Sequence, residues 1–398
     1  MSEQPICYIV APSTFNGWDN YIYDVVAERN ARYGIATRKI VGPFPTLPDI
    51  RQFNELVSGG NHGPYYIFTI NRILDVCHVL AKQPRLLTQV DCPVVSYMVD
   101  NIGRFAGTIC EVPIEREIRV VADARGEEIM SAVASHLPSS LFFPMWGLPR
   151  DPTPPHAPAE RDIDLLFIGN ITPVAEAERD AVTTARGHPD LVDFIHECAQ
   201  AQLATRGNQD PAILTLYLLV SKSMLQRHSI DVPWFSEIFR ASDTLARAHF
   251  REGLLRKFKK ARLTIVGTGA EHIAASQPNI TLLGAKPLTE MAAICQRAKL
   301  LLGDLAGFTG GVELRPSLAM SNGAGYIGET NPYLSQTVPS HCRIEDGGDL
   351  EDAALGAIAA PAALRAMTEQ AGAVYDQLVQ DNDLPFLPAA VGQLAKPD

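Results

Sequence analysis

The chain has 398 residues, of which 46% are hydrophobic and 20% charged, with a formal net charge of −11. This length predicts two domains of roughly 150 to 200 residues each, and no apolar run approaches the roughly 18 residues that a membrane span needs. The negative balance argues against a general affinity for nucleic acid, because phosphate binding needs a basic surface.

The N-terminal segment begins with a short apolar run at 6 to 12 and lacks the basic start and long apolar stretch of a signal peptide. We therefore expect a cytoplasmic protein. The seven cysteines include no CxxC pair, which favours buried thiols in a reducing compartment over disulfides or zinc ligands.

Apolar strands alternate with helical stretches before residue 145, a pattern typical of a parallel sheet covered by helices. The expected elements are strands at 6–12, 36–42, 65–70, 93–100, 118–124 and 140–144, with helices at about 18–33, up to 84 and near 126–136.

A proline-rich segment at 144 to 162 holds six prolines, which remove backbone donors and favour extended chain. The alternation of strands and helices starts again after it, with strands at 162–169, 263–269, 279–284, 299–307 and 324–329. The region from about 174 to 260 has long helical periodicity and is interpreted as a helical insertion.

The sequence thus predicts an α/β protein with two Rossmann-like, doubly wound domains that face a cleft. The expected boundaries are 1–145, a linker at 146–161, a second domain at 162–360, and a C-terminal segment at 361–398. Such sheets bind ligands at the carboxyl ends of their strands, so that edge is where we expect the site.

Gly267 and Gly269 directly follow one of these strands, in LTIVGTG, and allow backbone amides to approach an anion. His272 stands where a dinucleotide fingerprint needs its third glycine, so a nicotinamide cofactor is not favoured and no cofactor is expected. A structural turn without a ligand is the alternative.

The stretch FTGGVELRPSLAMSNGAGYIGE, residues 308 to 329, carries the strongest signal. Pro316 suits the first turn of a helix and Gly323 suits its end, which predicts a short helix at 316–322. The helix N-terminus and Arg315 would hold a diphosphate, with Gly310 and Gly311 permitting close approach. Arg315 is also a catalytic candidate, because charge that builds on a departing diphosphate is what helix amides and a guanidinium would stabilise. The alternative is a surface arginine paired with Glu313.

The order of these elements resembles the C-terminal half of GT-B glycosyltransferases, especially the spore-maturation-protein-like (CgeB type) group. The resemblance is clearest over about 162 to 330. It implies a C-terminal domain that holds a nucleotide-sugar donor and an N-terminal domain that meets the acceptor. The donor-binding residues that it implies are Gly169, Asn170, Gly267, Gly269, Gly284, Lys286 and Arg315. The residues of the 308 to 329 stretch add Gly310, Gly311, Glu313 and Ser317 to the donor-binding candidates.

The chain departs from the family pattern at the ribose-binding glutamate. Leu318 occupies the position where many relatives have this glutamate, and the first glutamate of their paired motif falls on Gly310. Glu313 is the substitute that the sequence offers.

The N-terminal half supplies catalytic candidates at two expected strand ends. Asp19 follows the first strand, near Thr14 and Asn16, and Asp100 follows the strand at 93–100. Either carboxylate could accept a proton from an attacking hydroxyl if the reaction inverts the anomeric centre. Helix capping by Asp19 and a buried turn at Asp100 are the alternatives.

The sequence contains no recognised motif for a metal site or for a serine hydrolase. The ten histidines include no HExxH and no cluster with metal-ligand spacing, and there is no GxSxG elbow. Asp162 and Asp164 form a D-x-D pair, but at the start of a strand, which is the wrong end for a ligand.

The leading hypothesis is a metal-independent glycosyltransferase that moves a sugar from a nucleotide-diphosphate sugar to the hydroxyl of a glycan, lipid or protein. A nucleotide-sugar epimerase or hydrolase of the same fold, and a non-catalytic nucleotide-sugar-binding protein, are the alternatives.

Overall fold

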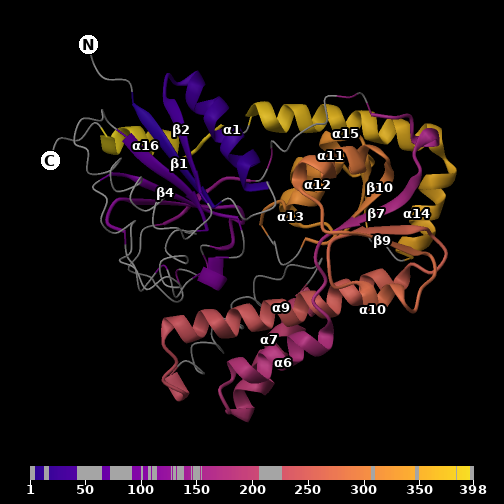
Figure 1. Cartoon of the computed structure of the whole chain (residues 1–398), viewed down its shortest axis with the longest axis horizontal. Coiled ribbons are helices and arrows are strands. Elements are labelled where there is room, and N and C mark those ends of the chain that lie inside the picture. Colours follow the sequence, from indigo (N-terminus) through magenta and orange to yellow (C-terminus); the bar gives the residue numbers. More distant parts are fainter. Residues whose placement is uncertain are drawn as a thin grey trace. The chain divides into compact units, whose positions relative to one another are not determined.

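The computed structural model describes residues 5–12, 18–42, 65–71, 92–99, 102–105, 109, 114–126, 128, 131, 139–144, 146, 153, 155–205, 226–305, 310–345, 349–381 and 383–394. The chain divides into two compact units (Figure 1). Unit 1 comprises Met1–Gly147 and Asn382–Asp398, and unit 2 comprises Leu148–Asp381. None of the described helices has the length and apolar character that crossing a membrane requires.

Unit 1 contains a parallel six-stranded sheet. In spatial order its strands are β2 (Ala36–Gly42), β1 (Ile6–Pro12), β3 (Tyr65–Ile70), β4 (Val94–Met98), β5 (Glu117–Val121) and β6 (Leu141–Phe142). Strands β3 and β4 are mostly apolar, and every residue except Tyr65 is buried, as expected for parallel strands covered on both faces. The expected strands therefore form one sheet in this unit.

Helices α1 (Trp18–Arg32) and α16 (Leu387–Leu394) pack against this sheet, α1 on β1 and β2 and α16 on β3. The residue before α16, Phe386, is fully buried, with its ring 5.5 Å from the ring of Phe68. A short 3-10 turn, η2 (Ile102–Phe105), follows β4. Leu384, Phe386, Leu387 and Ala390 are thus part of the core of unit 1.

Unit 2 contains a second parallel six-stranded sheet. In spatial order its strands are β12 (Arg343–Glu345), β11 (Gly325–Gly328), β10 (Ala298–Gly303), β7 (Ile163–Ile168), β8 (Leu263–Val266) and β9 (Ile280–Gly284). The core combines Leu165 and Phe167 of β7 with Leu300 and Leu302 of β10, all fully buried. The doubly wound α/β architecture expected from the sequence is confirmed, and β12 is a short edge strand that the sequence did not reveal.

The helical insertion of unit 2 consists of α6 (Val174–Thr184), α7 (Pro189–Thr205) and α9 (Val232–Lys257) in the described part of the chain, and it projects from the sheet (Figure 1). Both α6 and α7 pack along α9. Helix α9 begins where the Asp231 carboxylate accepts the Trp234 amide at 2.9 Å and ends in basic residues, which suit a helix C-terminus.

The remaining helices of unit 2 connect and cover the strands. They are η3 (Pro158–Glu160), α10 (Glu271–Ala274), α11 (Leu288–Gln296), α12 (Leu314–Ser321), α13 (Pro332–Thr337), η4 (Ser340–Cys342), α14 (Leu350–Ala359) and α15 (Pro361–Asp381). Helix α12 packs on β10, β11 and α15. It begins two residues earlier than the predicted 316–322. Pro316 is compatible with this start, because the first backbone amides of a helix have no hydrogen-bond partner within the helix, so the missing N–H of proline costs nothing there.

Candidate functional site

The second sheet changes its direction of winding between β7 and β10. The chain runs from β7 outward to β8 and β9, then returns to place β10 on the other side of β7. The loops that leave the carboxyl ends of β7 and β10 therefore diverge, and this is the point where doubly wound sheets bind ligands.

Arg315 bridges the carboxyl ends of these two strands. Its Nε donates to the Ile168 carbonyl at 2.5 Å, and its Nη1 donates to the Asp304 carbonyl at 3.2 Å. The side chain is only 6% exposed and lies over the ring of Phe167, 5.2 Å from the ring centre. A methyl group on Gly169 would come within 2.5 Å of Nη2, so the glycine leaves the space that the guanidinium fills. Arg315 is thus a buried tie between strands, whereas the sequence suggested an exposed cation.

Two carboxylates balance the charge of Arg315. An Asp304 carboxylate oxygen lies 2.7 Å from Nη1, and Glu313 also accepts a hydrogen bond from Nη1. Burial lowers the pKa of Arg315, but the two carboxylates outweigh it, so the net shift is upward. Burial raises the pKa of Glu313 against the opposing effect of Arg315. The sequence analysis gave a surface pair of Arg315 and Glu313 as the alternative to diphosphate binding. The two residues do pair, but inside unit 2 and not on its surface.

Arg251, on helix α9, is a member of this cluster that the sequence analysis missed. Its Nε donates to the Asp304 carboxylate at 2.7 Å, and its Nη1 donates to the Asn170 carbonyl at 2.7 Å. The side chain is 11% exposed, and its Nη2 makes no hydrogen bond to the described residues. Burial lowers the pKa of Arg251, and Asp304 opposes this effect. The contacts span 53 and 81 sequence positions, so no local motif could have signalled them.

Helix α12 starts beside this cluster without a side-chain cap. Glu313 occupies the N-cap position, but its carboxylate pairs with Arg315 instead of accepting a helix amide. An uncapped helix N-terminus carries partial positive charge and amide donors that suit an anion. Ser317, also predicted to bind the donor, is fully buried within the helix.

The glycine turn after β8 packs tightly on the loop after β7. A methyl group on Gly267 would lie 2.1 Å from the Gly169 carbonyl oxygen, and one on Gly269 would lie 1.9 Å from that of Ile171. The Asn170 side chain accepts the Thr268 amide at 3.1 Å, which joins the two loops. Neighbouring backbone therefore occupies the space that a side chain at Gly267 or Gly269 would need. This packing alone explains why both positions are glycine, without a ligand.

Four further predicted donor residues lie on the same edge of the sheet. Gly284 ends β9, and its carbonyl accepts the Gly267 amide at 3.0 Å. Lys286 is half-buried, with its ammonium 3.5 Å from Glu290. Gly310 and Gly311 precede α12, and the Gly311 carbonyl accepts a hydrogen bond from Asn331 at 2.8 Å.

The side chains of the predicted acid–base residues lie outside the described part of the chain. Asp100 lies outside the described residues, as do Thr14 and Asn16. Asp19 falls in the first turn of α1, and its side chain is also outside the described part.

The D-x-D pair lies at the opposite edge of the second sheet. Asp162 pairs with Arg297, while Asp164 pairs with Arg262 at 2.7 Å and Lys299 at 2.6 Å. These residues stand at the amino end of β7 and the adjoining strands. Both carboxylates therefore serve in ion pairs away from the carboxyl ends, Asp162 at the surface and Asp164 in a partly buried position.

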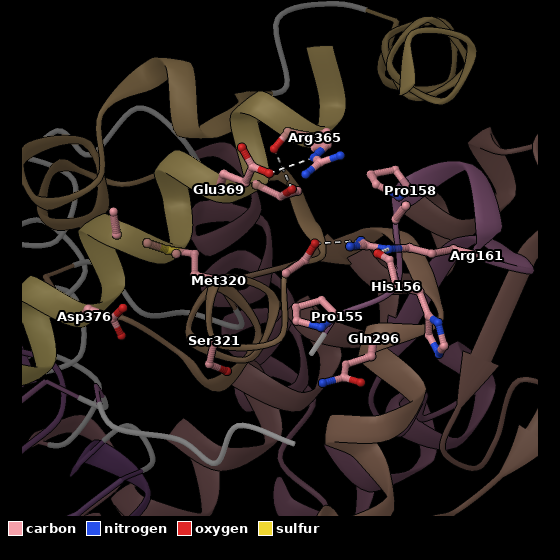
Figure 2. A pocket seen from close by; sticks show the side chains of 15 residues that line it. Pro155, His156, Pro158, Arg161, Gln296, Met320, Ser321, Arg365, Glu369 and Asp376 are labelled. Carbon is pink, nitrogen blue, oxygen red and sulfur yellow. Dashed lines mark hydrogen bonds and ion pairs between the residues drawn. The ribbon is translucent and has the colours of Figure 1, made fainter. Parts of the chain in front are cut away.

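A cavity of about 560 Å³ also opens at the amino edge, between the linker and helices α12 and α15 (Figure 2). The buried Arg161 ties this region together by donating to the carbonyls of Ala298 at 3.0 Å and Gly323 at 2.6 Å. Burial without a carboxylate partner lowers the pKa of Arg161 to about 10. Because Arg161 and Gly323 each precede a strand, this cavity is separate from the carboxyl-edge cluster.

No protein-family model and no curated protein matches the sequence. Solved structures match it over almost its whole length. A structure titled alpha-glucosyltransferase in complex with UDP and a 13-mer DNA containing a HMU base is 11% identical, with a TM-score of 0.54 and 100% of both chains covered. Another, of alpha-glucosyltransferase (AGT) in complex with UDP, is 12% identical with a TM-score of 0.52, covering 99% of this chain and 100% of that one.

Sucrose-phosphate synthase from Thermosynechococcus elongatus is 12% identical, with a TM-score of 0.50, covering 98% of this chain and 97% of that one. These structural neighbours are glycosyltransferases of the GT-B fold, and the present chain has that fold.

Proposed function

We propose that the chain is a glycosyltransferase that moves a sugar from a nucleotide-diphosphate sugar to the hydroxyl of a glycan, lipid or protein acceptor. We place it nearest the spore-maturation-protein-like group, on the run LAMSNGA and the glycine-ended strands before it. The observation that carries the proposal is the guanidinium of Arg251, anchored at the switch point of the second sheet beside the uncapped start of α12.

The proposed donor site holds a diphosphate by fixed dipoles and cations. Departure of the nucleoside diphosphate concentrates negative charge on the phosphate oxygens, and preorganised donors at that position lower the barrier. The amides of the first turn of α12 and the remaining N–H groups of Arg251 supply such donors. Arg315 and Asp304 hold these donors in place, so we assign them a positioning role.

Positive charge from guanidinium groups is the reason for proposing that the transfer needs no metal ion. A guanidinium presents planar paired donors that match phosphate oxygens. The acceptor hydroxyl would lose its proton either to a side chain such as Asp100 or Asp19, if the transfer inverts, or to the departing phosphate. The residue that meets the acceptor remains a prediction.

The proposal is tested by ligand binding and turnover with the whole chain. A nucleoside diphosphate that binds the native state must raise the melting temperature, so a panel of nucleoside diphosphates and nucleotide sugars is screened by thermal shift. Release of the nucleoside diphosphate is then measured with and without candidate acceptors. No stabilisation by any member of the panel would contradict the proposal, and donor turnover that needs no acceptor would favour the epimerase or hydrolase.

Arg251→Lys sharpens this test, because it keeps the charge and removes the fork of donors. We expect affinity for the nucleoside diphosphate to fall at least about tenfold, which corresponds to about 1.4 kcal/mol. Arg256→Lys is the matched control, since Arg256 lies on the same helix with a 43% exposed side chain paired to Glu252. Equal affinity of both variants would remove Arg251 from the site.

A further inference from the structure

Three potential metal ligands meet in the helical insertion of unit 2. The side-chain ligand atoms of His188, Asp190 and His228 all lie within 4.8 Å of one another. His228 Nε2 is 2.6 Å from an Asp190 carboxylate oxygen, and the rings of His188 and His228 meet edge to face at 5.3 Å. We call this group the histidine triad. Among the described residues, it is the group of at least three His, Cys, Asp or Glu side chains close enough to share a metal ion.

The turn between α6 and α7 places two of the three side chains. Arg186 and Gly187 both have positive φ, 51° and 84°, and reverse the chain immediately before His188. The His188 carbonyl accepts the Leu191 amide at 3.0 Å, which starts α7 and puts Asp190 in its first turn. The spacing of His188 and Asp190 is therefore fixed by the start of a helix.

Trp234 joins the start of α9 to the turn between α6 and α7. The indole Nε1 donates to the Thr184 carbonyl, the last residue of α6, at 2.9 Å. The Arg186 guanidinium lies over the indole at 4.7 Å, and the His188 ring centre is 5.9 Å from it. Since Trp234 is in the first turn of α9, these contacts bring the turn that contains His228 against the start of α7.

We propose that the histidine triad binds a divalent transition-metal ion of the zinc class. Two imidazoles with one carboxylate form a donor set that suits zinc, whereas calcium and magnesium prefer oxygen ligands throughout. Ligand atoms around a tetrahedral zinc ion lie about 3.3 Å apart, given bonds of about 2.0 to 2.2 Å. The ligand atoms lie within 4.8 Å of one another, and the side chains of His188 and Asp190 are exposed, so rotation of these side chains can bring the atoms to that spacing.

On metal binding, the proton that His228 Nε2 shares with Asp190 would move to Nδ1 of the same ring or leave to solvent, so that Nε2 and the carboxylate each offer a lone pair to the ion. The ring nitrogens of His188 make no hydrogen bond that competes, within the part of the chain that the structure describes. Three protein ligands leave the fourth position to water.

The triad is separate from the proposed donor site. Arg251 lies 19 residues after the first residue of α9, which is roughly 28 Å along a helix axis. A metal ion in the triad would instead cross-link Asp190 to His228 across 38 sequence positions. Such a link restricts the unfolded chain and stabilises the packing of α7 on α9.

The experiment uses the full chain after treatment with a chelator that is then removed. Zn²⁺ is titrated by calorimetry, and Co²⁺ is titrated while tryptophan emission is followed. We expect one equivalent of Zn²⁺ to bind, Co²⁺ to quench the emission of Trp234, and Zn²⁺ to reverse the quenching. Absence of saturable Zn²⁺ binding, or quenching that Zn²⁺ does not reverse, would overturn the proposal.

Substitutions assign the binding to the triad. His228→Gln and Asp190→Asn should both lose the Zn²⁺ equivalent while melting, in the presence of chelator, close to the parent chain. Asp193→Asn, at an exposed position on the same helix, should retain it. His196→Gln should also retain it, because His196 pairs with Glu178 at 2.9 Å, outside the triad. Retention by both triad variants, or loss in either control, would refute the assignment.

Discussion

Arg315 and Asp304 form a buried ion pair in which Nη1 lies 2.7 Å from the carboxylate and neither residue has more than 6% of its side chain exposed. Substitution Arg315→Met would leave Glu313 without the cation that it pairs with and Asp304 with Arg251 alone. Breaking a buried pair on one side costs about 3 to 5 kcal/mol. We expect such a loss in the free energy of unfolding, measured by urea denaturation.

Arg297→Met is the control for this experiment. Arg297 pairs with Asp162, but both side chains are more than half exposed, at 51% and 60%. Exposed pairs contribute about 0 to 1 kcal/mol. Equal destabilisation by the two substitutions would contradict the buried pair. The result also means that lost turnover in an Arg315 variant cannot by itself assign catalysis to Arg315.

The Gly269 position tolerates no side chain. Its φ is +84°, and a methyl group would lie 1.9 Å from the Ile171 carbonyl oxygen. We expect Gly269→Ala to lower the free energy of unfolding by more than about 3 kcal/mol, because strain and overlap with backbone act together.

Gly253 gives the opposite prediction with the same substitution. It lies inside α9, and nothing stands within 4 Å of an added methyl group. Gly253→Ala should therefore stabilise the chain by up to about 1 kcal/mol. Thermal and urea unfolding of both variants check the pair, and destabilisation by Gly253→Ala would contradict the open space beside this position.

Asp164 makes stability depend on pH in the acid range. Burial opposes ionisation, but hydrogen bonds from Arg262 and Lys299 outweigh it and hold the pKa of Asp164 below its ordinary value of 3.8. The contribution is therefore complete above pH 3.8 and lost as the pH falls through the folded-state pKa.

Asp164→Asn should cost about 1 kcal/mol near neutral pH, and its difference from the parent chain should vanish below that window. Asp162→Asn should show the same trend with a smaller amplitude, since that side chain is 60% exposed. Urea denaturation across the acid range measures both. A difference for Asp164→Asn that stays constant to the lowest pH would rule out the assigned pairing.

Phe386 anchors the C-terminal segment to the first sheet. It is fully buried, with rings of Phe68 and Phe143 at 5.5 and 6.3 Å. Phe386→Ala should destabilise the chain by about 3 to 5 kcal/mol. Val391, in the adjoining helix α16, is 39% exposed, so Val391→Ala should have little effect on the unfolding midpoint. Comparable losses for both variants would contradict the packing.

The sequence revealed the fold because apolar periodicity is a local property. The run at 163–168 reads as a buried parallel strand, and Gly323 ends α12 with a φ of +73°, as its position suggested. The site was harder, because its charges come from separate elements. Arg251 meets Asn170 and Asp304 only after α9 folds back on the sheet, and His228 meets Asp190 only through the packing of α7 and α9.

Arg315 shows the limit in the other direction. The sequence placed it at the start of a helix beside Glu313, which is correct, but an exposed and a buried arginine have the same local sequence. Burial follows from Phe167 and Gly169, more than 140 positions away, which form its surroundings. Local signals therefore located the arginine without establishing which groups it serves.

The core contact between Phe386 and Phe68 has a consequence for biosynthesis. The chain leaves unit 1 at Gly147 and returns to it only at Asn382. During translation, residues 1–147 are synthesised first, but the core of unit 1 is completed only after unit 2 has been synthesised. Until then Phe68 and Phe143 lack their contact with Phe386. We expect a nascent chain that stalls before this point to be a ready client for chaperones, with the second half already folded.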